Sequence, residues 1–351
     1  MSVAISDPRI VRLGRWNDTG AGIWSAWGGS QLRFRVSGAT VLTINANVVC
    51  ATGKLCICEC VIDDAPADSL QAFFANNENF SGARSVSFAL PSTGEHDITI
   101  KTNGYNADIF NGLSRSVVTS IDVGAGAILP PVLGPKLIQC IGDSWMAADA
   151  DWPRLMDQEV WRTYQIATGG LKVSDMNAQY AYSGNGIPAV DPAADAAMLS
   201  YGVNDYLANM SLSTYQANLL ALVDQVRTRQ SCPLFLIQTP RNLVNGRTYD
   251  QYGPAMQAVA SARSGVTYIP TSDIWAQLTW QSDGAHLDAG GKKIFASFID
   301  DKIKCALSIY VEAIRINGEP VLCTTIPTSR IYLRVNGLGI VSMPSGIGWP
   351  H

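Results

Sequence analysis

The sequence predicts an α/β fold: a five-stranded parallel sheet flanked by helices, with a β-sandwich or jelly roll before it and a small β-rich tail after it. Three observations support this expectation. Short β-prone runs separated by polar turns fill the first part of the chain. Apolar runs then alternate with helical stretches, and this helical period fades from Cys305 onward. We therefore expect three parts, at residues 1–130, 136–304 and 305–351.

The first part contains β-prone runs without a convincing helical period. They are Gln31–Val36, Thr40–Ile44, Lys54–Ile62, Ser85–Leu90 and Asp97–Thr102. Many short strands with turn punctuation are typical of a β-sandwich or jelly roll. The segment Gly124–Pro135 is rich in glycine and proline and is expected to be a linker.

The middle part contains five short apolar runs of the buried-strand type. They are Lys136–Ile141, Thr163–Ala167, Ala196–Tyr201, Leu234–Thr239 and Val266–Ile269. The clearest helix runs from about Thr214 to Arg229, with Ser213 and Gln216 as a capping box at its start. A last helix begins near Asp288.

The tail is expected to form strands at Ser308–Ile316, Pro320–Thr325 and Ile331–Val335, with a hairpin turn at Asn317-Gly318. It could complete the first part, extend the parallel sheet or form a contact between subunits. The sequence leaves these three alternatives open.

Composition excludes some partners. Net charge is −4 and the isoelectric point is near 5.4, whereas nucleic-acid-binding proteins usually carry a basic face. No apolar run approaches the ~18 residues of a membrane helix. Charged residues make up 15% of the chain, against about 25% in an average soluble domain, which is consistent with a homo-oligomer such as a trimer.

The first residues show neither a basic region nor an apolar core of a signal peptide. We expect a protein that stays inside the cell, leaves by another route or is released as part of a particle. The eight cysteines are then expected to be reduced. Cys56, Cys58 and Cys60 alternate along a predicted strand without a nearby histidine, which favours buried thiols over a metal site. Disulfides remain open.

Three fragments carry the chemistry. They are Ile-Gly-Asp-Ser-Trp at 141–145, Tyr-Gly-Val-Asn-Asp at 201–205 and Ser-Asp-Gly-Ala-His at 282–286. The first two follow predicted strands, and the third lies between the last strand and the last helix. Because the carboxyl ends of parallel strands meet at one rim of a sheet, we expect the three fragments to converge there.

Together these fragments provide the groups for acyl transfer. Ser144 can act as the nucleophile, His286 as its base and Asp283 as the group that orients the imidazole. The backbone N–H groups of Ser144 and Gly170 and the amide of Asn204 can form an oxyanion hole. Taken singly, Ser144 could be a helix N-cap, Asn204 a turn residue and His286 a structural histidine. The ordered set favours catalysis.

These residues resemble the SGNH (GDSL-like) hydrolase superfamily over about residues 136–304. The resemblance implies a flavodoxin-like catalytic domain without a metal or organic cofactor. Its marker residues fall on Ser144, a glycine, Asn204 and His286, and Asp283 matches the aspartate of its Asp-x-x-His block. Gly170 is chosen for the glycine by spacing, and Gly169 remains open.

The first part is similar to the jelly roll of carbohydrate esterase family two, on Gly14-Arg15-Trp16 and on the stretch from Trp27 to Gly38. That similarity implies removal of O-acetyl groups from sugars. Trp145 and Trp280 could then form a wall on which a sugar stacks, and Arg241 could contact a polar substrate group. Core packing and a solvated loop are the simpler interpretations of these side chains. His96 is expected to be structural, Asp205 to brace its loop, and the terminal His351 to take no part in catalysis.

We predict a serine esterase that removes acetyl groups from an oligo- or polysaccharide. A lipase or thioesterase-like enzyme of the same superfamily, or an inactive glycan-binding or structural particle component, are the alternatives. A bacteriophage tail protein acting on the bacterial cell surface would explain a sugar esterase that lacks an export signal.

Overall fold

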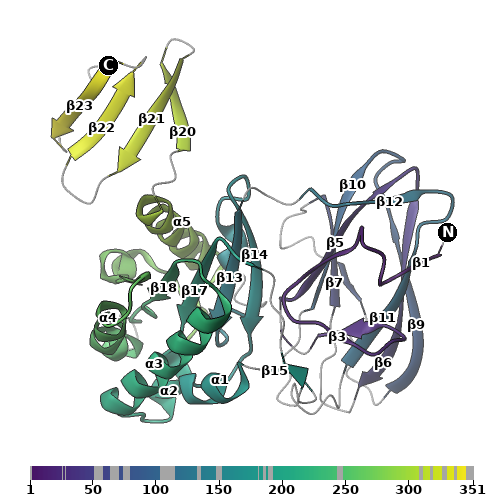
Figure 1. The fold of residues 1–351 in the computed structure, drawn as a ribbon, viewed down its shortest axis with the longest axis horizontal. Coiled ribbons are helices and arrows are strands. Elements are labelled where there is room, and N and C mark those ends of the chain that lie inside the picture. Colours follow the sequence, from purple (N-terminus) through teal and green to yellow (C-terminus); the bar gives the residue numbers. More distant parts are fainter. Residues whose placement is uncertain are drawn as a thin grey trace.

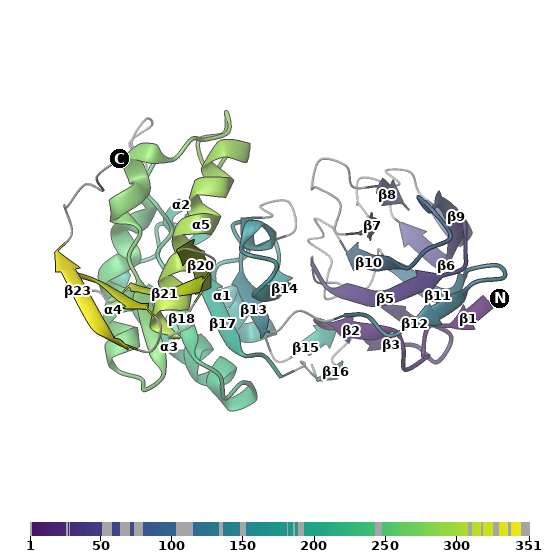
Figure 2. The same cartoon turned by 90° about the horizontal axis from the view of Figure 1, so that it is seen from above.

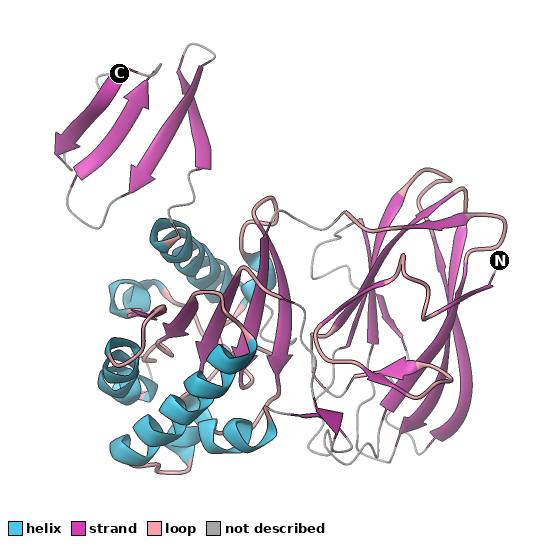
Figure 3. Ribbon diagram, in the orientation of Figure 1, coloured by secondary structure: helices cyan, strands magenta, loops and turns pink. Residues whose placement is uncertain are grey.

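A computed structural model describes residues 2–25, 27, 29–50, 58–63, 71–73, 80–102, 115–132, 136–147, 152–180, 182–184, 187–188, 193–242, 248–307, 311–316, 319–325, 330–335 and 338–344. Helices occur in the middle of the chain, and strands build both ends (Figure 1, Figure 3). Within these ranges, none of the helices combines the length and the apolar character needed to cross a bilayer.

The N-terminal part is a sandwich of two six-stranded antiparallel sheets. One sheet has the order β3-β4-β11-β6-β9 with β1 beside β11, and the other has the order β12-β5-β10-β7-β8 with β2 beside β5. The strands are β1 (Ser2–Ala4), β2 (Val11–Leu13), β3 (Asn17–Asp18), β4 (Ile23–Trp24), β5 (Gln31–Ser37), β6 (Val41–Cys50), β7 (Cys58–Ile62), β8 (Gln71–Phe73), β9 (Phe80–Ala89), β10 (His96–Thr102), β11 (Arg115–Asp122) and β12 (Ala127–Leu129). Alternate residues such as Leu32, Phe34 and Ile44 fill the core between the sheets.

The prediction for this part holds with two differences. Residues 54–57 of the expected run Lys54–Ile62 lie outside the described residues. The expected linker Gly124–Pro135 is wrong in part, because it contains strand β12, which pairs with β5. Ala127–Leu129 is a short apolar run, and the open edge of β5 satisfies its backbone groups.

The middle part contains the predicted five-stranded parallel sheet, in the order β14-β13-β17-β18-β19. All four strand pairs are parallel. The strands are β13 (Lys136–Gly142), β14 (Trp161–Ala167), β17 (Ala196–Ser200), β18 (Leu234–Ile237) and β19 (Val266–Ile269). The continuous burial of β17 and β18 explains why these strands read as apolar runs rather than as alternating ones, whereas β19, at the edge of the sheet, buries only Ile269.

Helices cover both faces of this sheet. Side chains of α1, α3 and α4 share one buried cluster with the sheet, and those of α5 and η2 share another. The helices are α1 (Val173–Gln179), α2 (Val203–Leu207), α3 (Leu212–Arg229), α4 (Gly253–Ser261) and α5 (Ala289–Ala306), and the 3-10 helices are η2 (Trp152–Leu155), η3 (Tyr249–Tyr252) and η4 (Ser272–Gln277). Strands β15 (Tyr182–Gly184) and β16 (Ile187–Pro188) pair antiparallel in a sheet of their own.

The starts of the two long helices test the capping predictions. Helix α5 begins as expected, and Asp288 accepts a hydrogen bond from the Gly291 N–H at 2.9 Å. The capping box at Ser213 and Gln216 is wrong: Ser211 is the N-cap of α3 and accepts from the Thr214 N–H at 3.2 Å. The apolar period did not include the first turn of α3, because Leu212 in that turn is exposed and lies off the buried face.

The β-sandwich covers the free edge of β14. The Gln31 side chain donates to the Thr163 carbonyl at 2.8 Å, and the Gln165 N–H donates to the Gly29 carbonyl at 3.4 Å. Leu13 and Trp27 join the buried cluster of α1 and α3. These contacts satisfy backbone groups of Thr163 and Gln165 on the edge strand β14, which would otherwise be left unpaired.

The tail forms its own four-stranded antiparallel sheet, drawn in yellow in Figures 1 and 2. Its strands are β20 (Val311–Ile316), β21 (Glu319–Thr325), β22 (Arg330–Val335) and β23 (Leu338–Pro344). The expected turn at Asn317-Gly318 lies outside the described residues, and β20 and β21 on either side of it pair. Among the described strands the tail neither completes the sandwich nor extends the parallel sheet. A role in subunit contacts stays a prediction.

Four cysteines are described as free thiols: Cys60, Cys140, Cys232 and Cys305. Burial raises the pKa of Cys60 to about 12. Cys56 lies outside the described residues, and Cys58 shares strand β7 with Cys60.

Candidate active site

The three fragments converge at the carboxyl rim of the parallel sheet. Ser144 follows β13, and Asn204 lies in the first turn of α2, directly after β17. Asp283 and His286 occupy the loop between η4 and α5. Residues at the rim are brought together because all strands of the sheet point the same way.

Ser144, His286 and Asp283 form a continuous hydrogen-bonded chain. The Ser144 Oγ lies 2.8 Å from His286 Nε2. His286 Nδ1 lies 2.6 Å from Asp283 Oδ2. Ser144 is 5% exposed, whereas the side chains of His286 and Asp283 are 26% and 45% exposed. The nucleophile candidate is therefore buried, whereas the side chains of its acid–base partners are open to solvent.

The charge of Asp283 fixes the tautomer of His286. Burial raises the pKa of Asp283, but hydrogen bonds from the His286 ring and from the His286 and Ala285 N–H groups outweigh it and lower that pKa to about 2. An ionised carboxylate offers only acceptors, so Nδ1 carries the proton. The lone pair of Nε2 then faces the Ser144 hydroxyl and can accept its proton.

The loop that carries Asp283 and His286 is closed on itself. Trp280 and Leu287 form an isolated antiparallel bridge, and the Gln281 N–H donates to the His286 carbonyl at 2.8 Å. Asn242, in the loop after β18, donates from Nδ2 to the Gly284 carbonyl at 2.9 Å. The acid–base loop is therefore held both from within and from the neighbouring rim loop.

The oxyanion candidates lie on two other rim loops. Asn204 Nδ2 donates to the Leu171 carbonyl at 3.1 Å and to Asp143 Oδ2 at 3.3 Å. Leu171 directly follows Gly170, so this bond ties Asn204 to the glycine loop. Gly170 has a φ of 82°, a conformation that glycine adopts without strain. The selection of Gly170 over Gly169 stays a prediction.

Sequence reasoning gave no role to Asp143 and named Arg241 instead of its neighbour Asn242. Asp143 is fully buried next to Ser144, and burial, helped by the nearby Asp205, raises its pKa to about 7. Asp205 braces its loop as expected, since its Oδ1 accepts from the Val173 N–H at 3.0 Å. Burial also raises the pKa of Asp205 to about 6. The sequence contained a signal for Asp143, because this carboxylate directly precedes the nucleophile candidate Ser144.

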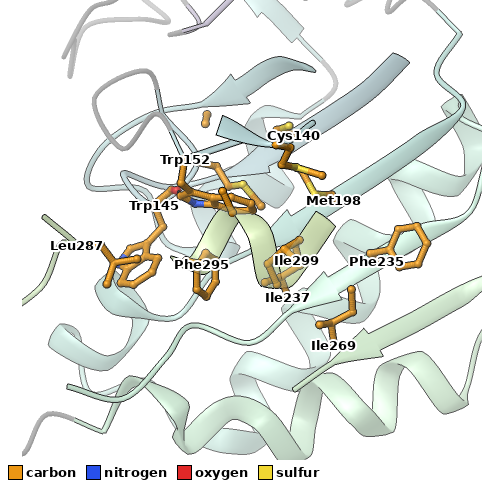
Figure 4. Close-up of a cluster of buried hydrophobic side chains, with 14 of the residues drawn as sticks. Cys140, Trp145, Trp152, Met198, Phe235, Ile237, Ile269, Leu287, Phe295 and Ile299 are labelled. Carbon is orange, nitrogen blue, oxygen red and sulfur yellow. The ribbon is translucent and has the colours of Figure 1, made fainter. Parts of the chain in front are cut away.

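The two tryptophans that were expected to form a sugar-stacking wall, Trp145 and Trp280, differ in exposure. Trp145 is 2% exposed and packs edge-on against Trp280 and Phe295, with centroid distances of 5.9 and 5.7 Å. Figure 4 shows Trp145 within the buried cluster that includes Trp152 and Phe295. A buried ring offers no face to a sugar, so Trp145 supports Trp280 instead. Trp280 is half-buried, and its contact with substrate stays a prediction.

Arg241 lies in the loop after β18 near Asp250. Burial raises the pKa of Asp250, and the charge of Arg241 opposes part of this rise. Its contact with substrate also stays a prediction.

His96 takes no part in this site. His96 is buried and bonded through Nδ1 to Asp63 at 2.7 Å and through Nε2 to Ser92 at 3.1 Å. This arrangement joins the end of β7 to the turn before β10, in line with a structural role. His351 lies outside the described residues. Among the side chains that the structure describes, no three His, Cys, Asp or Glu residues gather in a way that suits a metal ion.

Comparison with known proteins finds a family similarity in the middle part of the chain. Residues 140–294 match the model of the GDSL-like Lipase/Acylhydrolase family. That segment includes Ser144, Gly170, Asn204, Asp283 and His286. No curated protein matches the chain in sequence.

Solved structures resemble nearly the whole chain. A family two carbohydrate esterase from Clostridium thermocellum, in complex with cellohexaose, has a TM-score of 0.67 at 16% identity and covers 85% of this chain and 99% of its own. A family two carbohydrate esterase from Cellvibrio japonicus has a TM-score of 0.67 at 17% identity, with coverages of 87% and 97%. An acetyl xylan esterase from the rumen bacterium Butyrivibrio proteoclasticus has a TM-score of 0.68 at 12% identity, with coverages of 88% and 98%.

The likeness extends across the β-sandwich as well as the parallel sheet. Residues 140–294 thus match the GDSL-like lipase/acylhydrolase family, and the chain has the fold of an SGNH hydrolase joined to an N-terminal β domain.

Proposed function

We propose that this protein is a serine esterase that removes O-acetyl groups from a carbohydrate. The observation that carries the proposal is the hydrogen-bonded chain from Ser144 Oγ through His286 to Asp283. The substrate class is supported by solved structures of similar fold, which include family two carbohydrate esterases and an acetyl xylan esterase.

In the proposed reaction, Ser144 Oγ bonds to the ester carbonyl carbon while its proton passes to His286 Nε2. Asp283 stabilises the imidazolium that forms. The negative oxygen of the tetrahedral intermediate accepts hydrogen bonds from the Ser144 and Gly170 N–H groups and from Asn204. The intermediate then collapses, the carbon–sugar oxygen bond breaks, and the departing oxygen takes the proton from Nε2.

The second half of the reaction frees the enzyme. Water attacks the acetyl group on Ser144 and gives a proton to His286. The bond to Oγ breaks, acetate leaves, and the proton returns to Ser144. The scheme uses only side chains and backbone groups of this chain.

The test is acetate release from a panel of acetylated sugars and bacterial polysaccharides. We expect release by the wild type and a loss of roughly 10³-fold or more in Ser144→Ala, because the nucleophile is removed. Ser231→Ala changes an exposed serine just before β18, at the opposite end of the parallel sheet, and should retain full activity. Full esterase activity in Ser144→Ala would contradict the proposal.

Two other outcomes would select the alternatives. Faster cleavage of long acyl chains than of acetyl esters would favour a lipase or thioesterase-like enzyme. No release from any substrate, including p-nitrophenyl acetate, would favour an inactive glycan-binding or structural component.

We also propose that the protein acts as part of a bacteriophage tail on bacterial surface polysaccharide. The separate C-terminal sheet β20–β23 supports this, because it adds no strand to the described sheets of the sandwich or of the catalytic part, as we expect of a segment that serves assembly. A trimer in size-exclusion chromatography is the expected result. A monomer at micromolar concentration would contradict the oligomer proposal.

A further inference from the structure

Asp143 links the nucleophile turn to the oxyanion candidate Asn204. Its side chain is fully buried. Oδ1 accepts from the Trp145 N–H at 2.9 Å, one residue beyond Ser144, and Oδ2 accepts from Asn204 Nδ2 at 3.3 Å. The Asp143 carboxylate therefore contacts the nucleophile turn and the Asn204 loop, which are two of the three segments that supply donors to the proposed oxyanion hole.

We propose that Asp143 is a positioning residue that orients the side-chain amide of Asn204 for the oxyanion; this inference rests on the proposed esterase function. An asparagine amide has a donor side and an acceptor side of nearly the same shape, and the surrounding bonds decide which way it faces. Nδ2 of Asn204 lies between two acceptors, Asp143 Oδ2 and the Leu171 carbonyl. Turning the amide over would bring its oxygen against both.

The length of the Asp143 bond suits this role. At 3.3 Å it lies at the long end for an N–H···O bond, and the bond to Leu171 at 3.1 Å is shorter. The hydrogen facing Asp143 is oriented but weakly held, so sharing it with a developing oxyanion has a small cost. A donor set in place before the reaction needs no reorganisation when the charge appears.

Asp205 provides a matched contrast. It is also fully buried and directly follows Asn204 in the chain. Its Oδ1 accepts from the Val173 N–H, and its Oδ2 has no partner among the described residues. Asp205 therefore braces the start of α1 and does not hold the Asn204 amide.

The experiment compares Asp143→Asn, Asn204→Ala, the double variant and Asp205→Asn. Asp143→Asn keeps the shape of the side chain but can place an NH₂ group against the NH₂ of Asn204. We expect kcat to fall about 10²-fold in Asp143→Asn with KM within a few-fold, a loss of the size expected for one oxyanion donor. Asp205→Asn should stay within a few-fold of wild type.

The double variant separates positioning from a general structural effect. If Asp143 acts through Asn204, adding Asp143→Asn to Asn204→Ala should cause little further loss of kcat. Losses that multiply in the double variant would overturn the inference. An unchanged kcat in Asp143→Asn, or an equal loss in Asp205→Asn, would also overturn it.

A second readout separates this inference from the choice of substrate. Diethyl p-nitrophenyl phosphate modifies activated serines, and its phosphoryl oxygen gains charge where an ester oxygen would. Modification of Ser144 without acetate release from any sugar would remove the proposed substrate, and the four variants would then be compared by modification rate. Absence of modification in the wild type would overturn both proposals.

Discussion

Asn242 holds the acid–base loop from the side: its Nδ2 donates to the Gly284 carbonyl at 2.9 Å, within the turn between Asp283 and His286. Asn242 is 2% exposed, so this bond lies in a dry environment where a lost partner is costly. The contact joins the loop after β18 to the loop before α5, two segments that lie far apart in the chain.

Asn242→Ala should therefore lower kcat about 10-fold, because His286 loses its fixed position relative to Ser144. KM should change less. Steady-state kinetics on an acetyl ester measures both. Asn218→Ala, on helix α3, makes the same change away from the rim and should leave kcat unaltered. Equal kinetics in the two variants would show that the Gly284 bond does not position the loop.

Asp143 should make stability depend on pH. Burial raises its folded-state pKa from 3.8 to about 7, so the folded protein binds this proton more tightly than the unfolded chain does. The resulting stabilisation is fully present below pH 3.8 and is lost as pH rises through about 7. Asp143→Asn lacks this dependence. As pH rises between those values, the free energy of unfolding of the wild type should therefore fall relative to that of the variant.

Urea unfolding at several pH values between 4 and 8 checks the sign. Asp224→Asn is the control, because the bond with Arg263 lowers the pKa of Asp224 below its ordinary value of 3.8. Asp224 is therefore ionised in the folded and the unfolded protein over nearly all of this range, and the difference between Asp224→Asn and wild type should stay nearly constant. A pH-independent difference between Asp143→Asn and wild type would contradict the buried, proton-binding environment.

The contact between the sandwich and β14 can be tested with a pair of glycines. Gly29 has a φ of +88°, and a Cβ added there would lie 2.0 Å from Gln165 Oε1. Gly20 has a φ of +75° with nothing within 4 Å of the added Cβ. Both Ala variants carry the strain of a positive φ, but only Gly29→Ala also drives the two parts of the chain against each other.

We expect Gly29→Ala to lower the free energy of unfolding by roughly 1–3 kcal/mol more than Gly20→Ala, the usual cost of overpacking. Chemical denaturation of both variants measures the difference. Equal values would mean that Gln165 moves aside without cost.

Trp145 and Trp280 should respond differently to truncation. Trp145→Ala removes a buried ring from the cluster around Phe295 and should lower the free energy of unfolding by roughly 3–5 kcal/mol. Trp280→Ala should mainly raise KM for an acetylated oligosaccharide, since the proposed stacking face is lost. Unfolding curves and kinetics of both variants test the distinction. An unchanged KM in Trp280→Ala on every oligosaccharide would remove the stacking role.

Most of the fold could be predicted because its strands and helices each leave a pattern in their own stretch of sequence. The five parallel strands appear in the sequence as apolar runs, and Asp288 marks the start of α5. The start of α3 was missed since exposed Leu212 falls outside the apolar period. Strand β12 was taken for part of a linker because glycine and proline surround it, and only pairing with β5 makes it a strand.

The sequence by itself determined the residue types and their order: Ser144, Asn204, Asp283 and His286 at the ends of strands that a parallel sheet brings to one rim. Only the tertiary structure decided which neighbours matter. Burial turned Trp145 into a core residue and raised the pKa of Asp143, while the position of Gly284 gave Asn242 a partner 42 residues away in the chain. Burial and long-range hydrogen bonds depend on the packing of distant segments, and no local pattern records them.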